Sequence, residues 1–130
     1  MMFIDTNYFL RYLLNDISEQ HEEAKKVFLA GSEGKAELMT SSVVIFEIVW
    51  VLGSFYGVEK RGVVEALGKI LQLSFIELEE RDIFAHALPL FEKTNLSLED
   101  CYNIYYARSR GVKSDSFKTF DKKLEKEVSR

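Results

Sequence analysis

The sequence predicts an α/β fold in which a mainly parallel sheet lies between two layers of helices. Short apolar runs alternate with longer segments of helical periodicity, an alternation typical of strands joined by helical crossovers. No linker, repeat or low-complexity tract interrupts the 130 residues. Because domains most often contain roughly 100–150 residues, residues 1–130 are predicted to form one domain, a three-layer α/β/α sandwich.

The first strand is predicted over residues 2–4, because Met2, Phe3 and Ile4 form an apolar run without polar alternation, typical of a buried parallel strand. Further strands are predicted over residues 38–40, 74–78 and 117–120. Helices are predicted from Asp5 to a turn at 15–18 and over residues 18–30, 41–56, 58–71, 81–93, 97–110 and 121–128. Ser18 is expected to cap the second helix, and Pro89 to kink or split the fifth.

Composition limits the classes of protein that fit. No apolar run approaches the roughly 18–20 residues of a membrane span, and the first residues lack a signal-peptide pattern. The single Cys101 cannot form an internal disulfide. We therefore expect a cytoplasmic protein with no membrane partner.

The net charge of −4 is unevenly distributed, since residues 108–130 hold 8 Lys or Arg against 4 Asp or Glu. Such a segment can face a phosphate backbone, and it can equally be a solvated terminal helix. The candidate residues for contacting a phosphate backbone are Arg11, Arg108, Arg110, Lys113, Lys118, Lys122 and Lys123.

Two predicted strands end in an aspartate. Asp5 follows residues 2–4, and Asp121 follows residues 117–120. Ligands bind at the carboxyl edge of open α/β sheets, so both are site candidates. Taken alone, Asp5 is better explained as a helix cap.

Two further carboxylates lie in helical segments. Glu47 is the only charge in a helix that is apolar nearly all round, which favours a buried carboxylate in need of a partner, a polar cleft or a cation. The alternative is that Glu47 reaches solvent or pairs with a buried Arg. Asp100 lies three residues after Ser97, in the position of a capping box, and in isolation that local role suffices.

Together these pieces resemble the PIN domain, and most of all its VapC toxin branch. The resemblance rests on Phe-Ile-Asp-Thr-Asn-x-x-Leu-Arg-Tyr-Leu-Leu at residues 3–14, the lone Glu47, the helix start Ser-Leu-Glu-Asp at 97–100, and Thr-Phe-Asp-Lys-Lys-Leu at 119–124. It implies an α/β/α ribonuclease dependent on Mg²⁺ or Mn²⁺ and a cognate antitoxin. The implied acidic site residues are Asp5, Glu47, Asp100 and Asp121. The supporting polar residues are Thr6, Asn7 and Thr119.

The chemistry of these side chains agrees with that implication. Carboxylates without paired His or Cys favour a hard cation such as Mg²⁺ or Mn²⁺, bound as one ion or two. Asp5 and Asp100 are the first choices as direct ligands. Because the segment 112–117 is more polar than the family's usual last strand, Asp115 is left open as either a ligand or a solvated residue.

For the conspicuous aromatic residues, roles in the core or at an interface are favoured. Tyr102, Tyr105 and Tyr106 can stack on bases, but core or interface roles are favoured for them on this helix. Trp50, Phe55 and Tyr56 exceed what a small core holds and favour a homodimer. His21 and His86 have no metal-ligand spacing and are not proposed as catalytic.

Two other functions remain open beside the nuclease. One is a catalytically idle module that binds RNA or a protein. The other is a phosphohydrolase that forms an aspartyl phosphate on Asp5, which is weakened because Asp5-Thr6-Asn7 lacks a second aspartate.

Overall fold

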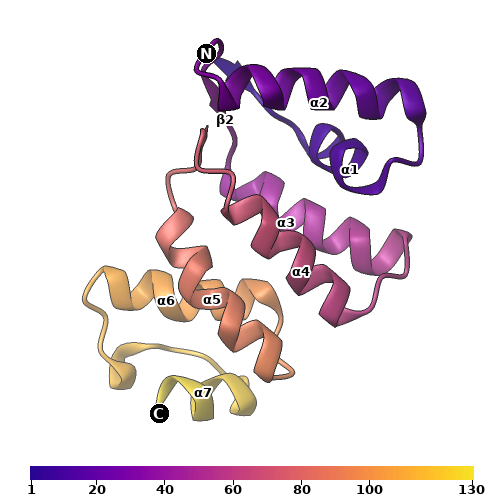
Figure 1. Ribbon diagram of the computed structural model, residues 1–130. Helices are drawn as coiled ribbons and strands as arrows, with labels where there is room; N and C mark the ends of the chain where they lie inside the picture. Colours follow the sequence, from indigo (N-terminus) through magenta and orange to yellow (C-terminus); the bar gives the residue numbers. More distant parts are fainter. The chain divides into compact units, whose positions relative to one another are not determined.

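The computed structural model describes all 130 residues and divides into two compact units. Unit 1 is Met1–Glu80 and unit 2 is Arg81–Arg130, and each is described by itself. Figure 1 colours unit 1 from indigo to rose and unit 2 from salmon to yellow. No helix in either unit has both the length and the apolar character needed to cross a membrane.

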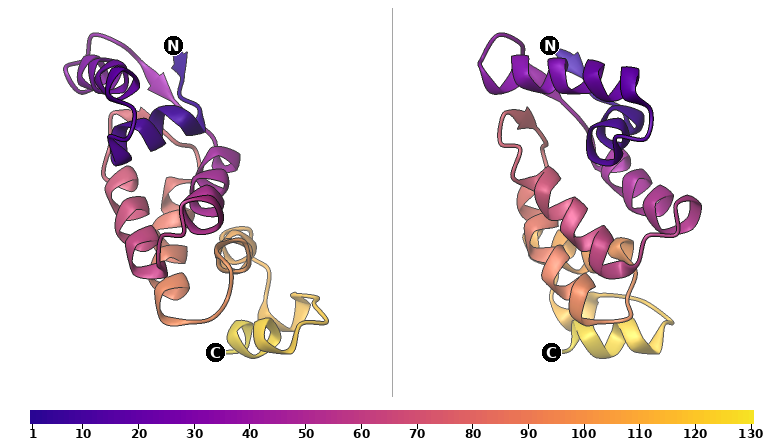
Figure 2. Two further views of the ribbon diagram at one scale, coloured as in Figure 1. Left: turned by 90° about the vertical axis from the view of Figure 1, so that its right-hand side faces the viewer. Right: turned by 45° about the vertical axis from the view of Figure 1, so that its right-hand side comes forward.

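The sheet lies in unit 1 and has three parallel strands in the order β1 (Met2–Phe3), β2 (Leu38–Met39) and β3 (Ile76–Glu77). Leu38 pairs with Met2 on one side and with Ile76 on the other. The arrows of β1 and β2 run side by side in Figure 2. A parallel sheet accompanied by seven α-helices confirms the predicted α/β class.

The first strand differs from the prediction in its burial. Met2 and Phe3 are exposed, and only Ile4, just after the strand, is buried. β1 is an edge strand with a single neighbour, β2. The unbroken apolar run was therefore wrong as a sign of a strand covered on both faces.

Four α-helices complete unit 1. They are α1 (Thr6–Leu14), α2 (Ser18–Ser32), α3 (Ser42–Trp50) and α4 (Lys60–Leu71), and a π-helical turn, η1 (Val51–Phe55), continues α3. Helix α1 packs against α2 and α3, and Phe9 of α1 lies 5.4 Å from Phe28 of α2 between ring centroids. The cap of α2 is Ile17, so Ser18 was wrong as the capping residue.

Unit 2 is helical. It contains α5 (Arg81–Lys93), α6 (Leu98–Ser109), a short 3₁₀ turn η2 (Ser114–Ser116) and α7 (Lys122–Val128). Helices α5 and α6 pack together (Figure 1), with the rings of Phe84 and Tyr102 5.4 Å apart. Pro89 lies inside α5 without splitting it.

The predicted strand at 117–120 does not form. The main-chain N–H of Phe117 donates to Ser114 within the 3₁₀ turn, and that of Asp121 donates to the hydroxyl of Thr119 at 3.0 Å. Phe120 is fully exposed. Local hydrogen bonds thus replace a strand ladder in this segment, and the fourth strand was a wrong prediction.

Candidate active site

Asp5 is the N-cap of α1. Its Oδ1 accepts a hydrogen bond from the main-chain N–H of Thr6 at 2.8 Å, and its backbone is extended, as a cap requires. The side chain is exposed at the point where the chain leaves β1. Asp5 therefore lies at the carboxyl edge of the sheet, as predicted, and also serves as the cap.

Thr6 connects Asp5 to Glu47. Thr6 is a buried residue, 3% exposed, and its hydroxyl donates to Oε1 of Glu47 on α3. One residue thus bonds both carboxylates, Asp5 through its N–H and Glu47 through its O–H. Elements 41 residues apart in sequence are joined at this point.

Glu47 itself is exposed, so the prediction of a buried carboxylate was wrong. Helix α3 buries the face that carries Val44, Ile45 and Ile48. Glu47 lies on the other face, which also exposes Val43 and Trp50. An apolar composition all round the helix did not mean that the whole circumference is covered.

Thr40 is a supporting residue that sequence reasoning missed. It is buried, and its hydroxyl donates to the main-chain oxygen of Ile4 at 2.8 Å. Its own N–H donates to the main-chain oxygen of Glu77 of β3 at 2.9 Å. Thr40 thus fixes the strand end that immediately precedes Asp5. A hydroxyl at the end of an apolar strand was the available signal.

The other two candidate carboxylates belong to unit 2. Asp100 lies in the first turn of α6, half-buried, and its N–H donates to the capping hydroxyl of Ser97 at 3.1 Å. Asp121 caps α7, and its Oδ1 accepts from the main-chain N–H groups of Lys123 at 2.9 Å and Leu124 at 3.2 Å. Both carboxylates therefore lie at the positive ends of helix dipoles.

The donor chemistry fits a hard cation. The hydrogen bonds of Asp5 and Glu47 use Oδ1 and Oε1, and each carboxylate keeps a second oxygen outside them. Oxygen donors of this kind suit Mg²⁺ or Mn²⁺. Within neither unit do three or more His, Cys, Asp or Glu side chains gather as a metal-binding group. Asp5 and Glu47 are the two candidate carboxylates that hydrogen-bond to the same residue, Thr6.

Asn7 and Thr119 are the remaining supporting residues named from the sequence. Asn7 is exposed in the first turn of α1, next to Thr6. Thr119 accepts from the N–H of Asp121, so it supports the carboxylate that caps α7. Asp115 is exposed in η2, where its main-chain oxygen accepts from Lys118 at 3.4 Å.

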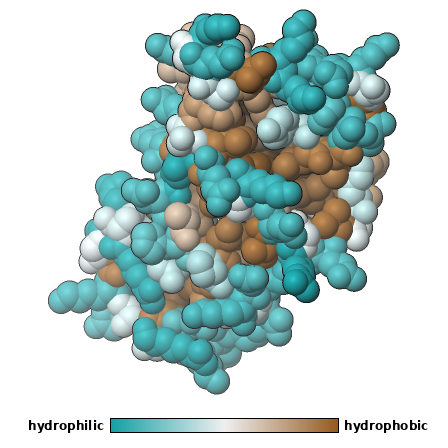
Figure 3. All heavy atoms as spheres, viewed as in Figure 1, coloured by the Kyte–Doolittle hydropathy of each residue, from teal (hydrophilic) through white to brown (hydrophobic).

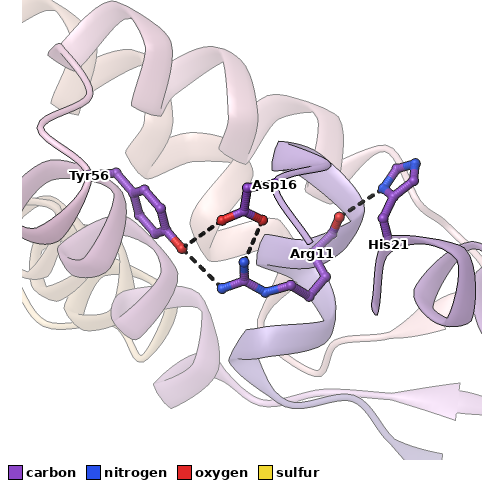
Figure 4. Close-up of polar contacts among 4 residues, drawn as sticks. All are labelled: Arg11, Asp16, His21 and Tyr56. Carbon is purple, nitrogen blue, oxygen red and sulfur yellow. Dashed lines mark hydrogen bonds and ion pairs between the residues drawn. The ribbon is translucent and has the colours of Figure 1, made fainter. Parts of the chain in front are cut away.

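Arg11 is held by a polar network in unit 1 (Figure 4). Its guanidinium pairs with Asp16 and donates to the hydroxyl of Tyr56 at 3.0 Å, and that hydroxyl donates to Asp16 at 3.3 Å. The hydrogen bond from Arg11 lowers the pKa of the Asp16 carboxyl, and the same bond raises the pKa of Arg11. The Arg11 side chain is only 12% exposed, so its charge is largely committed to this network.

The other candidate RNA-contacting residues lie in unit 2 and share one property, exposure to solvent. They are Arg108, Arg110, Lys113, Lys118, Lys122 and Lys123. Unit 2 holds 10 Lys or Arg against 8 Asp or Glu, whereas unit 1 holds 7 against 13. The positive charge predicted to face a phosphate backbone is therefore concentrated in one unit.

Comparison with known families matches residues 2–127 to the PIN domain. The match covers nearly the whole chain and includes residues of both units, so the protein belongs to the PIN domain family. Its sequence is similar to that of a VapC ribonuclease from Aquifex aeolicus (strain VF5), with 26% identity over 113 residues, which are 87% of this chain and 83% of that relative. No solved structure gave a significant match.

Proposed function

We propose that the protein is an endoribonuclease that depends on Mg²⁺ or Mn²⁺ and hydrolyses RNA phosphodiester bonds. The observation that carries the proposal is the bonding of Asp5 and Glu47 by the single residue Thr6, in a chain of the PIN domain family. The similarity to a VapC ribonuclease supports RNA as the substrate.

In this proposal the acidic residues supply oxygen donors to the cation. The proposed set is Asp5, Glu47, Asp100 and Asp121. One or two bound ions would lower the pKa of a water and neutralise charge on the phosphate under attack. Thr6 would hold the carboxylates of Asp5 and Glu47 in a fixed mutual position, so that little reorganisation is needed when the ion binds. Exposed basic side chains of unit 2 would bind the RNA backbone.

The proposal includes a cognate antitoxin protein as partner, which would restrain the nuclease. The VapC similarity supports this assignment, and the acidic balance of unit 1 favours a basic antitoxin segment. Purification from the native source would test it. Recovery of the protein without any small partner would count against the assignment.

A homodimer is also proposed. Val43, Trp50 and Phe55 are 74%, 64% and 76% exposed on α3 and η1, and hydrophobic residues gather over the α3 and α4 region in Figure 3. Exposed apolar area of this kind marks interaction surfaces. Light scattering on the purified protein would give the mass, and a monomeric mass at all concentrations would refute the dimer.

The central experiment is cleavage of structured and single-stranded RNAs with Mg²⁺, Mn²⁺ or EDTA. We expect cleavage in metal and none in EDTA. Asp5→Asn and Asp100→Asn should each lower the rate by about a thousandfold, because they remove charge from the metal donors. Glu22→Gln, an exposed carboxylate on α2, is the matched control and should cleave normally.

Calorimetry with Mn²⁺ gives an independent readout. If the wild type cuts no RNA and binds no metal through Asp5 or Asp100, the nuclease proposal fails. The idle binding module would then be the better description. Trapping with beryllium fluoride on Asp5 would instead support the phosphohydrolase.

A further inference from the structure

A cavity of about 310 Å³ lies in unit 2, and none of the four candidate carboxylates is among its lining residues. Helix α5 contributes Asp82, Ile83 and His86 to its lining, and helix α6 contributes Tyr105, Arg108 and Ser109. On α6, Arg108 and Ser109 lie three and four residues after Tyr105, so these side chains share one helix face. The lining thus combines a flat aromatic surface with one cation, Arg108, one carboxylate, Asp82, and small polar groups.

Three planar groups are in contact at this cavity. The ring centroids of His86 and Tyr105 are 5.6 Å apart with 32° between the planes. The guanidinium carbon of Arg108 lies 5.2 Å from the centroid of Tyr105. These separations fall in the ranges of aromatic and cation–π contacts. The sequence favoured a core role for Tyr105, whereas the structure leaves it half-buried between two exposed residues, His86 and Arg108.

The polar side chains at the cavity form some hydrogen bonds within the protein and retain other polar atoms that these bonds do not involve. Nδ1 of His86 donates to the main-chain oxygen of Asp82 at 2.8 Å, which leaves Nε2 outside that bond. The hydroxyl of Ser109 donates to the main-chain oxygen of Tyr106 at 2.6 Å. Arg108 makes its cation–π contact and no ion pair, so its positive charge is not neutralised by a carboxylate.

We propose that His86, Tyr105 and Arg108 form a stacking site for an unpaired base of the RNA, with Arg108 also contacting the adjoining phosphate. The proposal rests on the proposed ribonuclease function and adds a binding subsite to it, in which these three side chains hold one unpaired base. Single-stranded RNA is bound in this way by aromatic and arginine side chains that stack on bases, next to cations that follow the backbone.

Part of the proposed stacking site lies on the same helix, α6, as Asp100. Tyr105 and Arg108 lie five and eight residues after Asp100 on the same helix. At 1.5 Å per residue, they are about 7.5 and 12 Å from Asp100 along the helix axis. A base held there is therefore at a fixed separation from one proposed metal donor.

The test measures binding in EDTA, where no cleavage can occur. The probes are a short fluorescein-labelled oligoadenylate and an abasic strand of the same length, which carries the same phosphates without bases. We expect the wild type to prefer the oligoadenylate by about tenfold. Tyr105→Leu should remove this preference, and Tyr105→Phe should retain it.

Two further variants separate stacking from general effects. Arg108→Gln should weaken binding of both strands, because it removes a phosphate contact and its charge. Tyr106→Leu changes a tyrosine of α6 that does not line the cavity, and should bind like the wild type. Ultraviolet crosslinking to a thiouridine-containing strand should label the peptide that contains Tyr105. Thermal melting confirms that each variant is folded.

The outcomes distinguish this inference from the nuclease proposal. If the wild type cleaves RNA but Tyr105→Leu keeps the preference for bases, the stacking site is refuted and the nuclease stands. An equal loss in Tyr106→Leu would also refute the assignment to this cavity. If the wild type neither binds nor cleaves any RNA of the panel, both proposals fail.

Discussion

The two units place their carboxylates in different ways. In unit 1, Asp5 and Glu47 are bonded to one buried residue, Thr6, and a second buried hydroxyl, from Thr40, fixes the strand end beside them. In unit 2, Asp121 caps a helix and Asp100 occupies a first turn, and neither depends on a buried polar side chain. The acidic pair of unit 1 is therefore held next to buried hydroxyl-bearing residues, whereas the acidic pair of unit 2 lies at helix N-termini.

This difference predicts which substitutions of neighbouring residues should alter the positions of the candidate carboxylates. A buried hydroxyl that loses its role leaves an unsatisfied acceptor, which is costly. An exposed cap can be replaced by water at a smaller cost. Positioning residues of the site are thus expected in unit 1, whereas unit 2 offers surface cations and aromatic groups for binding.

The largest effect that tests this comparison is expected for Thr6→Val. Valine keeps the shape and the main-chain bond to Asp5 but removes the hydroxyl that bonds Glu47. Outer-shell partners of metal ligands typically matter by about 10–100-fold. We expect cleavage to fall by about that factor, measured at saturating and at limiting Mn²⁺, with RNA binding in EDTA unchanged.

Thr6→Ser is the matched control, because it restores the donor. It should recover most of the cleavage and most of the Mn²⁺ affinity. Equal losses in Thr6→Val and Thr6→Ser would show that packing of the methyl group matters rather than the bond to Glu47. Full activity of Thr6→Val would show that the acidic pair of unit 1 needs no such support.

A smaller effect is expected for a pair of threonines, one from each unit. Thr40→Val removes a buried donor to Ile4 and should lower the free energy of unfolding by about 1–2 kcal/mol. Thr119→Val removes an exposed acceptor for the N–H of Asp121, which water can replace, and should cost under about 0.5 kcal/mol. Urea unfolding of both variants gives the two values. Equal costs would contradict the contrast between the units.

Much of the fold could be predicted because its signals are local. The alternation of apolar runs with helical periodicity gave seven helices and three strands in their observed order. The cap of α6 at Ser97 and its end before Gly111 follow from local chemistry, since Gly111 has a φ of 79° that other residues rarely adopt. The position of Asp5 between a strand and a helix was equally local.

The remaining features depend on tertiary contacts. Strand formation at 117–120 needs a neighbour to pair with, and periodicity cannot show that local turns satisfy those groups instead. The exposure of Glu47 depends on which face of α3 is covered. The bond from Thr6 to Glu47 joins residues 41 positions apart, and no spacing rule predicts it. The tilted ring contact of His86 with Tyr105 likewise arises only when α5 packs on α6.

The smallest effect is expected for Asp16 in unit 1. Asp16 pairs with Arg11 and accepts a hydrogen bond from Tyr56, a network that the acidic caps of unit 2 do not have. The pKa of Asp16 is lowered in the folded state by the hydrogen bond from Arg11. Because the folded pKa lies below the unfolded one, the network stabilises the protein above the ordinary pKa of 3.8. That stabilisation is lost as the pH falls through the lowered folded-state value.

Asp16→Asn should therefore melt slightly below the wild type at pH 6, and the gap should narrow as the pH falls below about 4. Tyr56→Phe removes one hydroxyl but keeps the ion pair, so its deficit should depend less on pH. Thermal melts of the three proteins from pH 6 to about pH 3 measure both trends. A gap for Asp16→Asn that stays constant with pH would show that the carboxylate charge does not contribute. The network would then act through packing and neutral hydrogen bonds, as the buried hydroxyls of unit 1 do.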